Sequence, residues 1–484
     1  MNTTSKKRTR SPRNVKKKRP RSQKSLLEQK LAMMNPNAAG IDIASREHWV
    51  CVPEDRVEPN VRQFGTFTCD LYAIAAWLKD CDITSVAMES TGVYWIPLFQ
   101  VLERQGLEVC LVNAKHLKNV SNRPKTDRLD CQWIQRLHSY GLLAASFRPE
   151  DEMCQLRSLL RHRDTLIQAS TRHIQHMQKA LHQMNLILDT VISNITGATG
   201  LRIIQAILDG ERRPEILTQY RDFRIKATEE EIAKSLEGTY REEHLFVLRQ
   251  AYTAYQFAQQ QIMACDQAVE TLLKKVDKAV DANHRPLPAS TSSHRKPQGH
   301  EPTYHARSYV YEIYGVDLTQ VPGFQASTVQ TLLSEVGRDM TKWKTEKHFT
   351  SWLGLSPNAK RSGGKNQSMK TRKVQSRAAL AFRHAARAVS QSHSSIGAFY
   401  RRLRSRCGPS KALTATARKL AVIFYHMVKE GKEYQELGEA YYIKQHEKRQ
   451  LKKLKTQARL LGFELIPTPT AIQQPEAGGK ENTG

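Results

Sequence analysis

The sequence has few cysteines, no long apolar run and no apolar stretch at its N-terminus. Its eight cysteines are scattered along 484 residues without a C-x-x-C pair. This spacing does not indicate a zinc knuckle or a disulfide framework, and it favours a reducing compartment. No apolar run approaches the roughly 20 residues of a membrane-spanning helix, and the N-terminal region lacks the apolar core of a secretory signal. We therefore expect a soluble, cytoplasmic protein.

Acidic residues are scarce relative to basic ones. The chain has 75 Lys and Arg against 47 Asp and Glu, a formal net charge of +28. Such an excess binds polyanions by releasing their condensed counterions, so nucleic acid is the expected partner. Residues 1–37 concentrate this charge and predict a disordered basic arm that adds non-specific affinity for nucleic acid, with a nuclear address as the alternative.

The first third of the chain has the pattern of an α/β domain. Strand-like segments near 41–52, 57–67, 83–88 and 107–112 alternate with helical segments at 71–78 and 95–105. A two-stranded start followed by helical crossovers predicts a mixed sheet with helices on its faces. We therefore expect residues 38–149 to adopt the plan of the ribonuclease H fold, as in RuvC-like domains.

The rest of the chain has mainly helical patterns. Residues 150–280 contain two long amphipathic segments, near 150–190 and 229–276, which predict coiled-coil-like arms that pair within the chain or with another subunit. A polar linker is expected at 281–306. Residues 307–435 should form a mainly α-helical C-terminal domain, followed by a basic tail at 436–484 whose end we expect to be disordered.

Four carboxylates in the α/β domain are the leading candidates for chemistry. Asp42 interrupts an apolar strand, Glu89 ends another, and Asp127 and Asp130 share one face of a predicted helix. An ionised carboxylate inside an apolar strand is costly unless a cation or strong donors stabilise it. Taken singly, each acid also has a plain explanation: Asp127 as a helix cap, or Glu89 as a solvated strand end.

Together, the four acids predict a metal site. Neighbouring carboxylates repel one another, and Mg²⁺ or Mn²⁺ relieves that repulsion because these ions prefer oxygen ligands. Two such ions would stabilise the attacking and leaving oxygens of a phosphoryl transfer.

The sequence around these acids resembles a known family. Residues 87–95, 113–115 and 123–130 are similar to the DEDD domain of insertion-sequence transposases that are related to Piv-type DNA invertases. Residues 321–324, 352–357 and 361–365 are similar to the C-terminal domain of the same family, which carries a reactive serine. The resemblance extends over residues 35–434. Two departures are a longer, more polar linker and the segment 375–380, which differs where many members have Gly followed by Leu-Arg.

The resemblance implies a transposase or site-specific recombinase of an insertion sequence. Asp42, Glu89, Asp127 and Asp130 would hold Mg²⁺ or Mn²⁺, and Ser362 would be the nucleophile that forms a covalent serine–DNA phosphodiester. The resemblance further implies a homo-oligomer, a dimer or tetramer, whose acid and serine domains meet from different subunits. A non-coding guide RNA encoded by the element and a bacterial, nucleoid-associated location are also implied.

The residues around Ser362 allow two interpretations. The serine lies in a basic, glycine-containing segment that would favour phosphate, but no neighbouring His or carboxylate is present to activate its hydroxyl. An ordinary flexible turn is the alternative.

Two other functions stay open at this point: a RuvC-like junction nuclease that uses water as nucleophile, and a non-enzymatic basic protein that binds nucleic acid. His173, His176 and His182 have helical spacing but no acidic or Cys neighbour, so we predict no zinc site there. Tyr94 and Trp95 are expected to belong to the core or to help position DNA.

Overall fold

A computed structural model describes residues 33–113, 126–290, 300–363 and 365–466. The chain divides into two compact units, the first ending at Arg148 and the second beginning at Pro149. The predicted basic arm lies outside the described residues except for its last few positions, and so does the end of the basic tail. Within the described ranges, no helix is both long enough and apolar enough to cross a membrane.

The first unit is built on a five-stranded mixed sheet. In sequence order its strands are β1 (Ala38–Ile43), β2 (His48–Cys51), β3 (Val61–Phe64), β4 (Ser85–Glu89) and β5 (Glu108–Val112). The order across the sheet is β3-β2-β1-β4-β5, with antiparallel pairing among the first three and parallel pairing of β1 with β4 and of β4 with β5. The predicted mixed sheet is confirmed.

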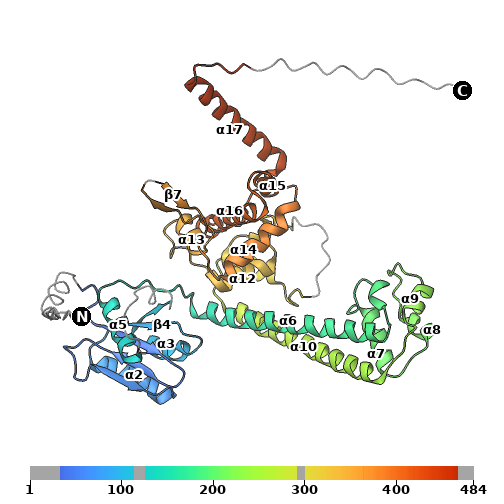
Figure 1. Cartoon of the computed structure of the whole chain (residues 1–484), viewed down its shortest axis with the longest axis horizontal. Coiled ribbons are helices and arrows are strands. Elements are labelled where there is room, and N and C mark those ends of the chain that lie inside the picture. The colour runs from blue at the N-terminus through green and yellow to red at the C-terminus, as the bar shows by residue number, and fades with distance from the viewer. Residues whose placement is uncertain (1–32, 114–125, 291–299, 364, 467–484) are drawn as a thin grey trace, which may run out of the picture. The chain divides into compact units, whose positions relative to one another are not determined.

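Helices cover both faces of this sheet (Figure 1). α2 (Thr68–Asp80) and α3 (Trp95–Arg104) pack over the main apolar core, to which alternate residues of β1 and β4 contribute. α5 (Asp127–Ser139) packs on the opposite face, where its buried Cys131 and Ile134 contact residues of the sheet. Because side chains alternate along a strand, each strand of the sheet contributes to both faces.

Two long antiparallel helices begin the second unit. α6 (Asp151–Gln183) and α10 (Glu242–Lys275) lie side by side, and a buried ion pair joins Arg163 Nε to Asp266 Oδ1 at 2.5 Å (Figure 1). The two predicted long helices therefore pair within the chain. The second was predicted to run from 229 to 276, and this was wrong in detail: α9 (Glu229–Ser235) ends before α10 begins, and Tyr240 between them has a positive φ of 46°.

Short helices pack at one end of the arm that α6 and α10 form. They are η1 (Leu188–Thr190), α7 (Ala198–Leu208), α8 (Pro214–Leu217), η2 (Thr218–Tyr220) and α9. Their buried aliphatic side chains share one core with the ends of α6 and α10.

The rest of the second unit is mainly helical, as predicted. Its elements are α11 (Ala306–Tyr314), η3 (Leu318–Gln320), α12 (Ala326–Val336), α13 (Glu346–Trp352), β6 (Lys360–Ser362), β7 (Lys365–Ser368), α14 (Arg377–Ala388), η4 (Val389–Gln391), α15 (Ser395–Cys407), α16 (Pro409–Glu430) and α17 (Gly438–Leu460). Aromatic side chains fill its core, where Phe349 contacts Phe382, Phe424 and Tyr425. The buried Tyr425 hydroxyl donates to the Trp343 carbonyl oxygen at 2.8 Å.

Candidate active site

Asp42 is the penultimate residue of β1, and Glu89 is the last residue of the neighbouring strand β4. β1 and β4 are parallel with Ile41 paired to Met88, so the next residue on each strand is one of the two acids. Ile41 and Met88 are buried in the core under α2 and α3. Because side chains alternate, Asp42 and Glu89 point to the opposite face, the one that α5 covers.

Asp127 and Asp130 lie in the first turn of α5. Thr126 caps this helix, and its hydroxyl accepts a hydrogen bond from the Leu129 amide at 3.3 Å. Carboxylates in a first turn are favoured by the positive end of the helix dipole. Asp127 is exposed and Asp130 is half-buried. The side chains that α5 buries follow Asp127 at helical spacing: Cys131, Ile134 and His138.

Gly40 determines how closely α5 approaches β1. A Cβ atom at this position would lie 2.2 Å from the Gln135 backbone nitrogen and 2.5 Å from the Cys131 carbonyl oxygen. Any side chain would therefore push the helix backbone off the strand. Gly40 precedes Asp42 by two residues and shares its face, so this close approach also places the start of α5 next to the acid.

The charges of the other three acids act on Asp42. Partial burial raises the pKa of Asp42 from its ordinary value of 3.8 to about 6, and the negative charges of Asp130, Asp127 and Glu89 contribute to this rise in that order of importance. Burial is the largest cause of this rise, and the like charges add to it. That the four residues form one metal site stays a prediction.

The acid cluster fits a hard divalent cation by its chemistry. All four side chains offer oxygen donors, and their repulsion is of the kind that Mg²⁺ or Mn²⁺ relieves. Among the described residues, no three His, Cys, Asp or Glu side chains are grouped closely enough to hold a metal ion. Residues 114–125, which precede α5 and include part of a predicted motif, lie outside that range.

Ser362 belongs to the second unit. It is the last residue of β6, and its side chain is exposed at the turn into β7. Gly363 follows with a positive φ of 55°, and a Cβ atom at this position would meet nothing within 4 Å, so the turn itself is open. This segment, for which an ordinary flexible turn was the alternative interpretation, is the end of a two-stranded hairpin in which Ser362 pairs with Lys365.

Comparison with known families matches both of these regions. Residues 39–186 match a DEDD-type IS110 family described as transposase, and residues 317–401 match the transposase IS116/IS110/IS902 family. Both families are transposases. No curated protein matches the chain. The first segment contains Asp42, Glu89, Asp127 and Asp130, and the second contains Ser362, so a transposase role acting on DNA is supported for the chain.

The hairpin of the second transposase segment is fastened at its base. The Asn358 amide donates to the Lys370 carbonyl oxygen at 3.1 Å, and Arg372 donates to the Ser351 carbonyl oxygen at the end of α13. Gly354, with a positive φ of 68°, lies so close to Val374 that a Cβ would meet its side chain at 2.7 Å. The exposed end that carries Ser362 therefore projects from a fixed base.

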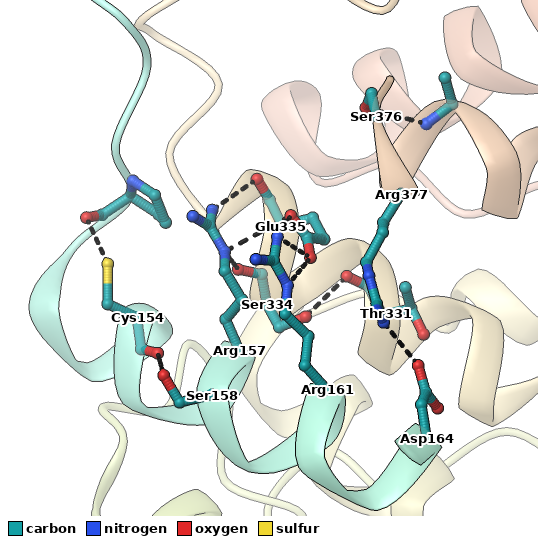
Figure 2. Close-up of polar contacts among 12 residues, drawn as sticks. Cys154, Arg157, Ser158, Arg161, Asp164, Thr331, Ser334, Glu335, Ser376 and Arg377 are labelled. Carbon is teal, nitrogen blue, oxygen red and sulfur yellow. Dashed lines mark hydrogen bonds and ion pairs between the residues drawn. The ribbon is translucent and has the colours of Figure 1, made fainter. Parts of the chain in front are cut away.

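Ion pairs join this transposase segment to α6 (Figure 2). Arg161 Nη2 lies 2.8 Å from Glu335 Oε1, and Arg157 donates to the carbonyl oxygens of Ser334 and Glu335 at the end of α12, at 3.1 and 3.2 Å. Such donors satisfy the free carbonyl groups of a helix end. Arg377, at the start of α14, donates to Asp164 at 2.7 Å. α6 thus supports the helices on either side of the hairpin.

Sequence reasoning gave no role to Gly40, Arg157, Arg161 or Glu335. The role of Gly40 could have been predicted from the sequence, because a glycine inside an apolar strand often marks a close backbone approach. No sequence pattern predicts the ion pairs of the other three residues, because Arg157 and Arg161 are far from Glu335 in the sequence. Of the aromatic pair, Trp95 packs against the core and contacts Phe99, whereas Tyr94 is exposed. His182, for which no acidic neighbour was expected, pairs with Asp189 at 2.7 Å.

Proposed function

We propose that this chain is a DNA transposase that cuts and rejoins strands through a covalent bond between Ser362 and DNA. The observation that carries the proposal is the match of residues 39–186 to a DEDD-type transposase family, and the action of the Asp130, Asp127 and Glu89 charges on Asp42 supports it. The exposed Ser362, on a firmly based hairpin within a second transposase-type segment, supplies a candidate nucleophile.

The acid cluster would hold Mg²⁺ or Mn²⁺ through Asp42, Glu89, Asp127 and Asp130. The bound ion would stabilise negative charge on the phosphate oxygens during transfer. Glu89 is already oriented by Thr91, whose hydroxyl donates to its Oε1 at 3.1 Å. Gly40 keeps the start of α5 against β1, so the acids from the helix stay beside those from the strands.

Ser362 would attack the phosphorus atom of a DNA phosphodiester. Its Oγ would form the new P–O bond while a carboxylate of the acid cluster accepts the hydroxyl proton. The bond to one deoxyribose oxygen would break, and the same carboxylate would pass the proton to that oxygen, which leaves as a free DNA hydroxyl. Attack of a DNA hydroxyl on the serine phosphodiester then reverses these changes and rejoins the strand. One phosphodiester replaces another at each step, so rejoining requires no external energy source.

The proposal extends to partners. The resemblance of the sequence to DEDD-serine transposases favours a homo-oligomer, a dimer or tetramer, in which acids and serine meet from different subunits. It also favours a guide RNA encoded by the element. The net charge of +28 suits contact with both nucleic acids.

A RuvC-like nuclease is the second candidate. It is favoured by the fact that the acid cluster lies wholly within the first unit and could activate water without Ser362. In this case the hairpin would bind DNA and take no part in bond breaking.

The deciding experiment asks whether protein becomes covalently attached to DNA. The full chain is incubated with element DNA, element-derived RNA and Mg²⁺, denatured, and separated by mass. Wild type and Ser368→Ala should form the adduct, because Ser368 lies on the partner strand of the same hairpin, whereas Ser362→Ala should not. Strand cutting by Ser362→Ala without an adduct would overturn the serine mechanism and favour the nuclease.

A further inference from the structure

A pocket lined by basic side chains lies among α15, α16 and α17, outside the acid cluster and the serine hairpin. Its volume is about 330 Å³, and each helix contributes a cation to its wall: Arg402, Lys419 and Arg449. These three residues lie beyond both segments that match transposase families, which end at residues 186 and 401.

Aromatic rings hold two of these cations in place. The Lys419 ammonium lies 4.8 Å from the centre of the Phe399 ring and 5.4 Å from that of Tyr442. Arg402 Nε donates to the Tyr442 hydroxyl at 2.8 Å. Cations fixed against aromatic faces lose little further freedom when an anion binds. The pocket wall is therefore ordered before any ligand arrives.

The pocket carries an excess of positive charge. Burial lowers the pKa of Lys419, Glu436 opposes this effect, and the charges of Arg402 and Arg449 add to it. Glu436 is the carboxylate that acts on Lys419, and it already accepts hydrogen bonds from the Ser395 and Gly438 amides, both at 2.8 Å. Three cations thus line the pocket, while Glu436, whose charge acts on Lys419, is hydrogen-bonded to backbone amides, an arrangement that suits an anion.

A row of cations continues from this pocket along α17. The helix has seven Lys and Arg against two Glu, and none of its residues is buried. Five of the cations recur at helical spacing on the face next to Arg449: Lys444, Lys448, Lys452, Lys455 and Arg459. They extend over about 22 Å at a rise of roughly 1.5 Å per residue. Figure 1 shows that α17 continues past α15, so most of this row is open to a large partner.

We propose that the pocket and the row form a binding surface for the sugar–phosphate backbone of a polynucleotide. One phosphate occupies the pocket among Arg402, Lys419 and Arg449, and the following phosphates contact the row on α17. A chain of phosphates satisfies both features at once, whereas a single small anion would explain only the pocket. Because contacts to phosphate carry no sequence information, this surface strengthens and orients binding without choosing a site.

The strength of such contacts follows from counterion release. The logarithm of the binding constant changes by about 0.9 per phosphate contact for each tenfold change in salt, so one contact accounts for about eightfold in affinity between 1 M and 0.1 M salt. Removing several contacts should therefore weaken binding and flatten its salt dependence together.

The test compares two variants of equal charge in the full chain. The first replaces Lys448, Arg449, Lys452 and Lys455 by Gln, and the control replaces the exposed Lys179, Lys226, Lys234 and Lys275 by Gln. Binding to a non-specific 30-bp duplex DNA and to a single-stranded RNA of 30 nucleotides is measured by fluorescence anisotropy across a salt series. Helix content, measured by circular dichroism, checks that each variant is folded.

The α17 variant should bind at least about tenfold more weakly than the control at 0.1 M salt, with a salt slope flatter by about 3 to 4. Loss for both probes indicates a shared backbone contact, and loss for one probe identifies DNA or RNA as the ligand. Equal affinity and equal slope in the two variants would overturn the proposal.

This inference shares with the proposed function only the premise that the chain acts on nucleic acid. Asp42→Asn removes an acid of the cluster and leaves α17 unchanged, so it should retain the full salt slope. Failure of the serine mechanism would therefore leave the α17 result unaffected. Equally, failure of the α17 proposal would leave the test of the Ser362 adduct unaffected.

Discussion

Replacing Asp42 by Asn should stabilise the first unit in the absence of divalent metal. Asp42 titrates near 6 in the folded chain and at 3.8 as an ordinary side chain, so its ionisation costs the folded state up to about 3 kcal/mol. Because Asp42 is only partly buried, solvent screening reduces the expected effect to about 1–2 kcal/mol. Asn has nearly the same shape and no charge, and it therefore removes this cost.

The sign of the pH dependence follows from the raised pKa. Between pH 3.8 and about 6 the folded chain holds a proton on Asp42 that the unfolded chain has lost, so rising pH lowers stability across this window. The gain from Asp42→Asn should be absent below pH 4 and complete above pH 7. Thermal unfolding in EDTA at pH 8 and at pH 5 would show it, with about 2–4 °C expected for each kcal/mol.

Two controls make this test specific. Asp80→Asn removes an exposed acid at the end of α2 and should leave the melting temperature unchanged at both pH values. Mg²⁺ should raise the melting temperature of wild type more than that of Asp42→Asn, because a ligand stabilises the state that binds it. If Asp42→Asn is no more stable than wild type at pH 8, the four acids do not repel as the structure indicates.

Three further substitutions test how the sites are held. Gly40→Ala should destabilise the first unit by more than about 3 kcal/mol, because its Cβ meets backbone atoms of α5. As a control, the added Cβ of Gly106→Ala meets no atom within 4 Å, so this variant should cost only about 1 kcal/mol of backbone strain. Urea unfolding measures both free-energy changes. Glu335→Gln should lower the stability of the second unit by about 2–3 kcal/mol, because it leaves Arg157 and Arg161 without a buried carboxylate. A smaller loss of stability in thermal unfolding than that of Asp164→Asn would contradict this. Asp164→Asn breaks only the exposed pair with Arg377 and should cost less than about 1 kcal/mol by the same measurement.

The elements that carry the four acids were largely predictable from sequence, because their positions follow local rules. Asp42 stands in a run of strand-forming residues, and Asp127 and Asp130 share one face of any helix that begins at Thr126. The pairing of Ile41 with Met88, and hence the proximity of Asp42 and Glu89, depends on the register of two strands more than forty residues apart. No local pattern specifies that register.

Features that depend on distant packing escaped prediction. The break between α9 and α10 interrupts an otherwise continuous helical pattern, because the short helix α9 packs back against the core at the end of the arm. α17 was expected only as a basic tail, since its charge obscured a helix that packs against α15 at its start. Its part in a pocket with Arg402 and Lys419 depends on three helices meeting.

The amino-acid sequence specifies the chemical groups that this protein has available: four carboxylates in an α/β domain, a serine among basic residues in a helical one, and a large positive charge. Residue types and short periodicities specify these, because they act over a few positions of the chain. Which segments approach one another depends on the folded structure. The glycine contact holds α5 close to β1, and the packing of α15, α16 and α17 gathers three cations in one pocket, because both depend on approaches between segments distant in sequence.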